Sequence, residues 1–170
     1  MIISGNNISL ELFNKQDINS DYINWLNDKD VVRFSRQRHK EHSFSTCLQY
    51  YDSLKKNKDY FLKIIFNKTN KFIGTMTYII DYDCVDIGIL IGDKNYWGKQ
   101  IGYEAWNLSI RYLFSLQKIN RITAGCLTEN IAMKKIMHKS NMVLVNNKTV
   151  FDKDNNIHEE FVYYEIFKQK

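Results

Sequence analysis

The sequence has no proline, only seven glycines and three cysteines in 170 residues. Without proline or a Gly/Ser-rich tract nothing marks a linker, so we expect one domain spanning residues 1–170. No run approaches the roughly 18 uninterrupted apolar residues of a membrane span, and the start lacks the basic and apolar regions of a signal peptide. We therefore expect a cytoplasmic protein without a membrane partner. The cysteines are scattered and odd in number, which favours reduced thiols over disulfides.

Arginine is scarce as well: five Arg and 19 Lys stand against 19 acidic residues, which gives a net charge of +5. The lysines are spread along the chain, and few arginines are available for bidentate phosphate contacts. We therefore predict no nucleic-acid partner, since a small polyanionic ligand accounts for the excess charge equally well. His39, His42 and Cys47 come nearest to a metal-ligand set but lack regular spacing, so we also predict no metal.

Hydrophobic periodicity predicts seven strands and four helices. Period-two patterns rich in Ile, Phe, Tyr and Thr favour strands at 8–12, 60–66, 71–82, 85–91, 121–126, 142–151 and 157–167. Apolar residues at helical spacing favour helices at 17–26, 43–56, 102–116 and 130–140.

The segment from Tyr96 to Ala105 runs from a strand end through a loop with two glycines into an amphipathic helix. The first N–H groups of a helix lack internal partners and carry about half a positive charge, so a phosphate can dock on them. The glycine spacing matches neither a P-loop nor a dinucleotide fingerprint. Taken alone, the segment is equally consistent with a plain strand-to-helix turn.

Four segments together resemble the GNAT family of acyl-CoA-dependent N-acyltransferases, in particular the branch of ribosomal-protein and amino-sugar acetyltransferases. Tyr96–Ala105 is similar to that branch's Y-W-G-K-G-x-[G/A]-T-E-A loop, and Asp86–Gly92 to its E-I-G-x-x-I-G strand. Asn24–Asp28 resembles the W-L-N-D helix end, and Asn130–Met142 the N-x-x-S-x-x-x-x-x-K-x-G-F helix. The match covers nearly the whole chain in the family's order.

The resemblance implies an α/β (α+β) domain with a mixed, mostly antiparallel seven-stranded sheet and helices on both faces. It also implies transfer of an acetyl group from acetyl-CoA to a primary amine, on a nucleotide-linked amino sugar or a protein N-terminus. Strands 85–91 and 121–126 would splay apart, so that main-chain groups of Ile89, Leu90 and Ile91 pair with the pantetheine. The pyrophosphate would lie on the loop amides of Gly98, Lys99, Gln100, Ile101, Gly102 and Tyr103, and Asn130 would hydrogen-bond the pantetheine. The assembly expected is a monomer or homodimer.

The chain departs from the family pattern at several positions. Gln100 replaces the first loop glycine, which costs about 1 kcal/mol if that position needs a positive φ. Asn141 replaces a glycine at a helix end, where Asn tolerates the left-handed conformation. Met133 and Met137 replace the serine and tyrosine that are the family's usual acids, so the CoA thiolate would leave unprotonated or take its proton from water.

Attack on a thioester needs a neutral amine, so a base should accept a proton. Asp86, at the family's acidic position two residues before Gly88, is the predicted catalytic residue; its alternatives are a solvated strand acid or a binder of a cationic substrate. Asp83 and Glu104 are weaker candidates, and Glu104 favours its helix N-terminus electrostatically.

Other side chains allow more than one reading. The aromatic residues Trp25, Phe34, Tyr50, Tyr51, Tyr78 and Tyr82 could line an acceptor pocket, although core packing is the commoner role. The four histidines are expected in solvent. Two other functions stay open: a CoA-binding module with little catalysis, and a basic RNA- or ribosome-binding protein.

Overall fold

A computed structural model describes residues 2–153 and 155–169. Its eight strands form one sheet in the order β1-β2-β3-β4-β5-β6-β8-β7. Among the strand pairs of the described residues, only β5–β6 is parallel. The strands are β1 (Ile2–Ser4), β2 (Ile8–Leu12), β3 (Tyr60–Phe66), β4 (Lys71–Asp81), β5 (Cys84–Ile91), β6 (Arg121–Leu127), β7 (Val143–Asp152) and β8 (Ile157–Phe167). The mixed, mostly antiparallel architecture is as expected.

The strand count corrects the expectation of seven. The additional strand, β1, pairs antiparallel with β2, and the turn between them is closed by the N–H of Gly5, which donates to the Ile8 carbonyl at 2.8 Å. Its three residues are too few to show alternation, so the sequence pattern carries no signal for it.

Each helix begins at a side-chain cap or a turn that the sequence supplies. The helices are α1 (Ser20–Asn27), α2 (Phe44–Asn57), α3 (Ile101–Ser115) and α4 (Ile131–Lys139). Asn19 caps α1, Ser43 caps α2 in a capping box with Thr46, and Asn130 caps α4. Helix α1 begins later than predicted because residues 15–17 form a separate 3₁₀ turn. In the described part of the chain, no helix combines the length and apolarity needed to cross a membrane.

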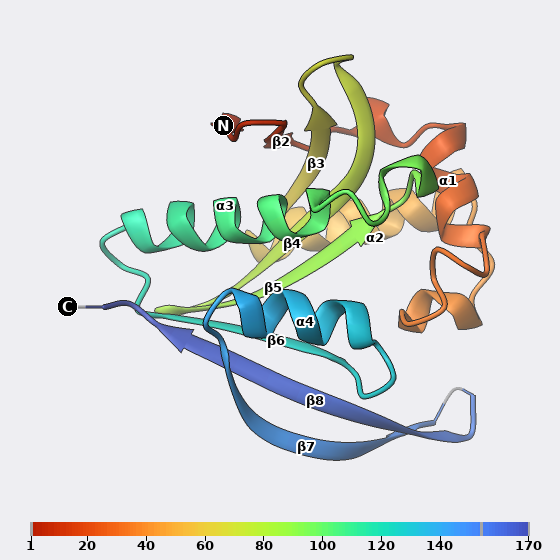
Figure 1. The fold of residues 1–170 in the computed structure, drawn as a ribbon. Helices are drawn as coiled ribbons and strands as arrows, with labels where there is room; N and C mark the ends of the chain where they lie inside the picture. The colour runs from red at the N-terminus through yellow and green to blue at the C-terminus, as the bar shows by residue number, and fades with distance from the viewer. Residues whose placement is uncertain (1, 154, 170) are drawn as a thin grey trace.

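The helices cover both faces of the sheet, as expected. Helices α3 and α4 lie over one face (Figure 1), where Tyr78, Trp106 and Ile122 are buried in the larger core. Helices α1 and α2 cover the other face through a smaller, aromatic core that includes Phe13 and Phe61. Burial of these apolar side chains is the main force that holds the layers together.

Strands β5 and β6 diverge after a short contact. Their ladder consists of Cys84↔Arg121, Val85↔Ile122 and Asp86↔Thr123, whereas β6 continues to pair with β8 as far as Leu127. Figure 1 shows the two strands separating beyond this point. Main-chain groups on the β6-facing edge of residues 87–91 therefore have no strand partner within the described sheet, which makes this edge available to an extended, amide-containing ligand.

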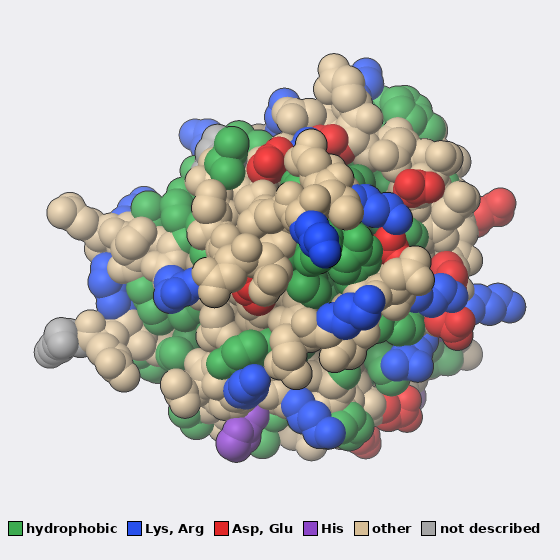
Figure 2. Space-filling model, turned by 45° about the horizontal axis from the view of Figure 1, so that its top comes forward, with side chains coloured by type: hydrophobic (Ala, Val, Ile, Leu, Met, Phe, Trp, Pro, Cys, Tyr) green, Lys and Arg blue, Asp and Glu red, His purple; other side chains and the backbone are tan. Residues whose placement is uncertain are grey.

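On the face seen in Figure 2, basic side chains are dispersed and form no single patch. Figure 2 shows Lys and Arg dispersed across one face, with acidic side chains among them on one side. A protein that binds nucleic acid through its phosphates usually concentrates such charge in a stripe or patch.

Candidate active site

A cavity of about 700 Å³ lies at the divergence of β5 and β6, and we call it the α3–α4 cavity. It is bounded by β5, by the start of α3, by α4 and by the connection between α1 and α2. Nine of the predicted cofactor-binding residues line it: Ile89, Leu90, Ile91, Gly98, Gln100, Ile101, Gly102, Tyr103 and Asn130. The tenth, Lys99, is exposed outside the lining, with its ammonium 5.9 Å from the centre of the Tyr96 ring.

The loop before α3, which we call the cradle, leads directly into the first turn of that helix. Gly98 has φ 72° and Gln100 has φ 63°, and the helix begins directly afterwards at Ile101. The N–H groups of Ile101, Gly102 and Tyr103 belong to the first turn, which has no intrahelical acceptors for them. Gln100 thus adopts the left-handed conformation that glycine would adopt without strain, at a cost of about 1–2 kcal/mol.

The cradle is bordered by cationic side chains that were not among the predicted site residues. The Lys139 ammonium donates to Oε1 of Gln100 at 3.2 Å and lies 4.0 Å from the centre of the Tyr103 ring. Arg33 and Lys135 also line the cavity. Together with the helix N-terminus, these side chains create a positive field that suits a phosphorylated ligand.

Helix α4 forms the opposite wall. Oδ1 of Asn130 caps the helix by accepting from the N–H of Met133 at 3.1 Å, which leaves the Nδ2 group of Asn130 for a ligand. Met133 and Met137 are both buried, Met137 completely. A thioether carries no proton to donate, so α4 supplies no acid at these two positions. Asn141, at the end of α4, has φ 60°, which confirms its predicted left-handed conformation.

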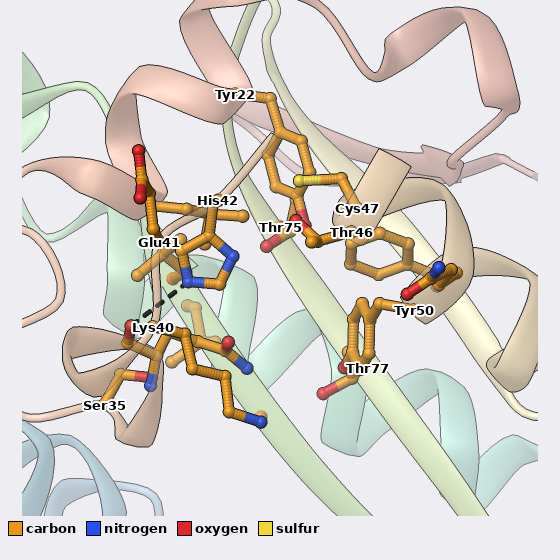
Figure 3. Close-up of a pocket in the computed structure, with 17 residues that line it drawn as sticks. Tyr22, Ser35, Lys40, Glu41, His42, Thr46, Cys47, Tyr50, Thr75 and Thr77 are labelled. Atoms are coloured by element: carbon orange, nitrogen blue, oxygen red, sulfur yellow. Dashed lines mark hydrogen bonds between the residues drawn. The ribbon is translucent and has the colours of Figure 1, made fainter. Parts of the chain in front are cut away.

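A second cavity of about 590 Å³, the α1–α2 cavity, lies on the other face of the sheet. Its floor includes Thr75 and Thr77 of β4 and Gly88 and Leu90 of β5, and its sides come from α1, α2 and the connection between them. Figure 3 shows hydroxyl, amide and aromatic side chains directed around it. Among the described residues, its charged or ionisable lining comprises Tyr22, Lys40, Glu41, His42, Cys47 and Tyr50.

The two cavities adjoin near the C-terminal end of β5. Ser35, Ile89 and Leu90 line both of them. A ligand bound along the β5 edge in one cavity can therefore present its reactive end to a ligand in the other. This arrangement is what a direct group transfer between two bound substrates requires.

The connection between α1 and α2 is held against the site by polar contacts. Lys94, in the 3₁₀ turn (Lys94–Tyr96) that precedes the cradle, contacts Asp28 at 2.7 Å and Asp30 at 3.1 Å. The hydrogen bond from Lys94 lowers the pKa of Asp28. At the end of β5 the Trp25 ring packs so closely on Gly92 that a Cβ there would lie 2.0 Å from the ring. These contacts join the Asn24–Asp28 segment to Gly92 and Lys94 at the end of β5.

Asp86 lies outside the lining of both cavities. By register it is on the same face of β5 as Gly88, where its Oδ1 accepts a hydrogen bond from the Thr123 hydroxyl at 3.0 Å. Asp86 is exposed at the surface, but desolvation by the groups packed around its carboxyl raises its pKa, and the Thr123 hydrogen bond opposes that shift. Its role as the base stays a prediction.

The weaker acid candidates have structural partners. Glu104 accepts from the N–H and the side-chain amide of Asn7, at 2.7 and 2.8 Å, and so joins α3 to the turn between β1 and β2. Asp83 accepts from the side chain of Asn120 at 3.2 Å.

The aromatic candidates divide between cavity and core. Tyr50 lines the α1–α2 cavity and Phe34 the α3–α4 cavity, whereas Tyr51 and Tyr78 are buried in the cores and Tyr82 is 77% exposed. Trp25 packs edge-on against Phe72.

Two of the four histidines are not the solvated side chains that the sequence suggested. His42 lines the α1–α2 cavity, and His39 contacts the buried Glu159 at 3.6 Å. No sequence motif marks either position: the partner of His39 is distant in the chain, and those of His42, Gln37 and Asn27, form no recognisable pattern with it.

The cysteines are buried free thiols, as expected. Cys47 borders the α1–α2 cavity, but burial raises its pKa, and burial raises that of Cys126 to about 11. A protonated thiol is a poor nucleophile, so these two groups are unsuited to carrying an acyl group between the cavities.

Comparison with known proteins shows the family to which the chain belongs. The acetyltransferase (GNAT) domain model matches residues 7–143. The chain belongs to the GNAT acetyltransferase family. It is therefore an N-acetyltransferase, and its acetyl donor is acetyl-CoA. No curated protein sequence matches the chain.

Solved structures share the GNAT fold at low sequence identity. A GNAT-family acetyltransferase from Bacillus anthracis has a TM-score of 0.85 and 19% identity, with both chains covered completely. Ribosomal-protein-S5-alanine acetyltransferase from Vibrio fischeri has a TM-score of 0.74 and 19% identity, covering 100% of this chain and 98% of that one. Spermidine N-acetyltransferase from Vibrio cholerae, in complex with CoA and spermine, has a TM-score of 0.83 and 15% identity, with 96% and 97% covered.

Proposed function

We propose that this GNAT protein transfers the acetyl group to the primary amine of a small, polar and largely uncharged acceptor, such as an amino sugar. The observation that carries the proposal is the junction of the two cavities at Ile89 and Leu90. In this arrangement acetyl-CoA occupies the α3–α4 cavity, and the acceptor occupies the α1–α2 cavity.

Different main-chain segments of the α3–α4 cavity bind different portions of acetyl-CoA. The amides from Gly98 to Tyr103 bind the diphosphate, and the β6-facing edge of Ile89–Ile91 pairs with the pantetheine. A main-chain N–H of this edge polarises the thioester carbonyl, as an oxyanion hole does. The amine then attacks directly in a ternary complex, without a covalent enzyme intermediate.

The lining of the α1–α2 cavity supports an uncharged acceptor. Hydroxyl and amide groups of Ser35, Gln37, Thr46, Gln49, Thr75 and Thr77 can hydrogen-bond sugar hydroxyls, and Tyr22, Tyr50 and Phe61 add apolar surface. In the described lining Glu41 is the only carboxylate, and Lys40 opposes it. A polyamine with several positive charges would find little compensation there. The volume of about 590 Å³ is that of a small-molecule site.

The test is a thiol-release assay with acetyl-CoA and a panel of amines: free and nucleotide-linked amino sugars, aminoglycosides, polyamines and N-terminal peptides. We expect kcat/KM for an amino sugar to exceed that for any polyamine by at least about tenfold, which corresponds to about 1.4 kcal/mol. A preference for polyamines or peptides would contradict the proposed acceptor. Tight acetyl-CoA binding with no release of CoA thiol in the presence of any amine would favour the CoA-binding module instead. Association with RNA that falls steeply with salt and does not depend on acetyl-CoA would favour an RNA-binding protein.

A further inference from the structure

His42 is held at the edge of the α1–α2 cavity by a reciprocal pair of hydrogen bonds with Asn27. The N–H of His42 donates to Oδ1 of Asn27 at 2.9 Å, and Nδ2 of Asn27 donates to the His42 carbonyl at 2.8 Å. Asn27 is the last residue of α1, so this contact fixes the His42 backbone relative to a helix 15 residues away in sequence. The imidazole therefore starts from a fixed point.

The ring itself is oriented by a second main-chain contact. Its Nε2 lies 3.1 Å from the carbonyl oxygen of Gln37. A carbonyl oxygen can only accept, so the hydrogen in this contact must be on Nε2. In the neutral ring Nδ1 is then left with a free lone pair. Figure 3 shows the Nε2 contact as a dashed line and the other ring nitrogen directed toward the side of the cavity that carries Tyr22 and Thr46.

The other titratable groups around the cavity are poor proton acceptors. Tyr22 of α1 and Tyr50 and Cys47 of α2 have pKa values raised by burial, so all three stay protonated near neutral pH. Lys40 is a cation on the same connection as His42. The residues that β4 and β5 contribute to the lining carry no charge. Glu41 is exposed, and Figure 3 shows its carboxylate pointing away from Thr77 and Tyr50.

We propose that Nδ1 of His42 is the base that accepts a proton from the acceptor's ammonium group. The inference rests on the proposed function, because it requires the acceptor amine to lie in the α1–α2 cavity. Imidazole is the side chain whose ordinary titration range suits proton transfer near neutral pH. The signal was absent from the sequence because the residues that orient the ring, Asn27 and Gln37, form no motif with it.

The protons and electrons balance as follows. The ammonium gives one proton to Nδ1, and the freed amine lone pair forms the C–N bond to the thioester carbonyl carbon. The C–S bond then breaks, and its electron pair leaves with the CoA sulfur. The nitrogen loses its second proton, which goes to that sulfur through water. His42 returns its own proton to solvent, so the sum is ammonium plus acetyl-CoA giving amide, CoA thiol and one proton.

Asp86 is the rival base, and the two assignments predict different variants to be inactive. His42→Gln places an amide NH₂ where it can still donate to the Gln37 carbonyl, but it removes the basic nitrogen. We expect kcat at pH 7 to fall about 100-fold, the lower end of typical general-base effects. The acetyl-CoA Kd should stay within twofold and the melting temperature within a few degrees. His138→Gln, an exposed histidine on α4 outside both cavities, is the matched control and should keep wild-type kinetics.

Two further measurements distinguish loss of the basic nitrogen of His42 from a mere change in the shape of the cavity. The acid limb of the wild-type kcat–pH profile should be missing from His42→Gln, whose residual rate should follow only ionisation of the amine. Added imidazole should restore at least about tenfold of the activity lost in His42→Ala, because the truncated side chain leaves room for it.

The outcomes separate this inference from the proposed function. If wild-type protein releases CoA with amino sugars while His42→Gln stays within threefold of wild type, His42 is not the base but the acceptor proposal stands. Loss of activity in Asp86→Asn, with no imidazole rescue of His42→Ala, would likewise overturn the inference in favour of Asp86. If wild-type protein acetylates none of the amines, both proposals fail.

Discussion

The guanidinium of Arg38 donates to the carboxylate of Glu159 and thereby joins the connection between α1 and α2 to β8, 121 residues later. The Glu159 side chain is 3% exposed, and Arg36 and His39 approach it at 3.5 and 3.6 Å. The same connection contributes walls to both cavities. This buried cluster therefore positions the part of the chain that the acceptor and the donor share.

Glu159→Gln should loosen that wall. Loss of the carboxylate leaves Arg38 without its buried counter-charge, which should lower the free energy of unfolding by about 1–3 kcal/mol. We also expect the KM of the acceptor to rise about tenfold, with a smaller effect on kcat. Chemical denaturation and steady-state kinetics measure the two effects. Glu160→Gln, at the adjacent exposed position, is the control; an equal loss there would show that the cluster has no special role.

Gly102→Glu should abolish acetyl-CoA binding, because it places a carboxylate where the cradle is proposed to bind the diphosphate. A Cβ at Gly102 would meet its nearest atom, Cδ1 of Ile136, at 3.4 Å, which is ordinary contact. Gly102→Ala should therefore fold and keep its affinity within about threefold. Isothermal titration calorimetry compares the two variants, and unchanged affinity in Gly102→Glu would refute the loop assignment.

Gln100→Gly should stabilise the protein by about 1 kcal/mol, because glycine adopts the left-handed conformation without the Cβ strain. Acetyl-CoA affinity should change by less than threefold, since the backbone N–H is retained. Lys58→Gly is the matched control, because Lys58 has φ 64° at the end of α2, away from both cavities. A tenfold loss of affinity in Gln100→Gly alone would show that the Gln100 side chain holds the cofactor.

Asp93→Asn should reduce stability in a pH-dependent way. Burial disfavours the charge of Asp93, but hydrogen bonds from Lys71 at 2.7 Å and from Asn95 outweigh it and lower the pKa. A carboxylate with a lowered folded-state pKa stabilises the protein above the unfolded value and loses that contribution as the pH falls through the folded value. We expect a loss of about 1 kcal/mol at pH 7 that shrinks below about pH 4. Thermal melts at several pH values test this; a constant difference, or the same trend in the exposed Asp81→Asn, would contradict it.

The bounds of some strands could be predicted to the residue from the local sequence pattern. Strands β3 and β8 have the predicted bounds, since alternating apolar residues end at clear polar turns. Nine of the ten cofactor-binding candidates line one cavity, because the glycine loop and the β5 edge are continuous segments with recognisable sequences.

The acceptor cavity lay beyond sequence reasoning for a physical reason. Its lining joins α1, the α1–α2 connection, α2, β3, β4 and β5, and periodicity predicts neither a helix nor a strand for residues 31–41 of that connection. The function of a residue such as His42 depends on where Asn27 and Gln37 hold it, which tertiary packing decides. The φ of Gln100 was undetermined for the same reason, because propensity alone would not place Gln there.

The most direct test of the account is a crystal structure of the protein in complex with acetyl-CoA. We expect the diphosphate on the amides of Gly98 to Tyr103, the pantetheine along the edge of β5, and the acetyl group at Ile89–Leu90, open to the α1–α2 cavity. An acetyl-CoA molecule bound elsewhere, or one whose acetyl group is closed off from that cavity, would contradict it.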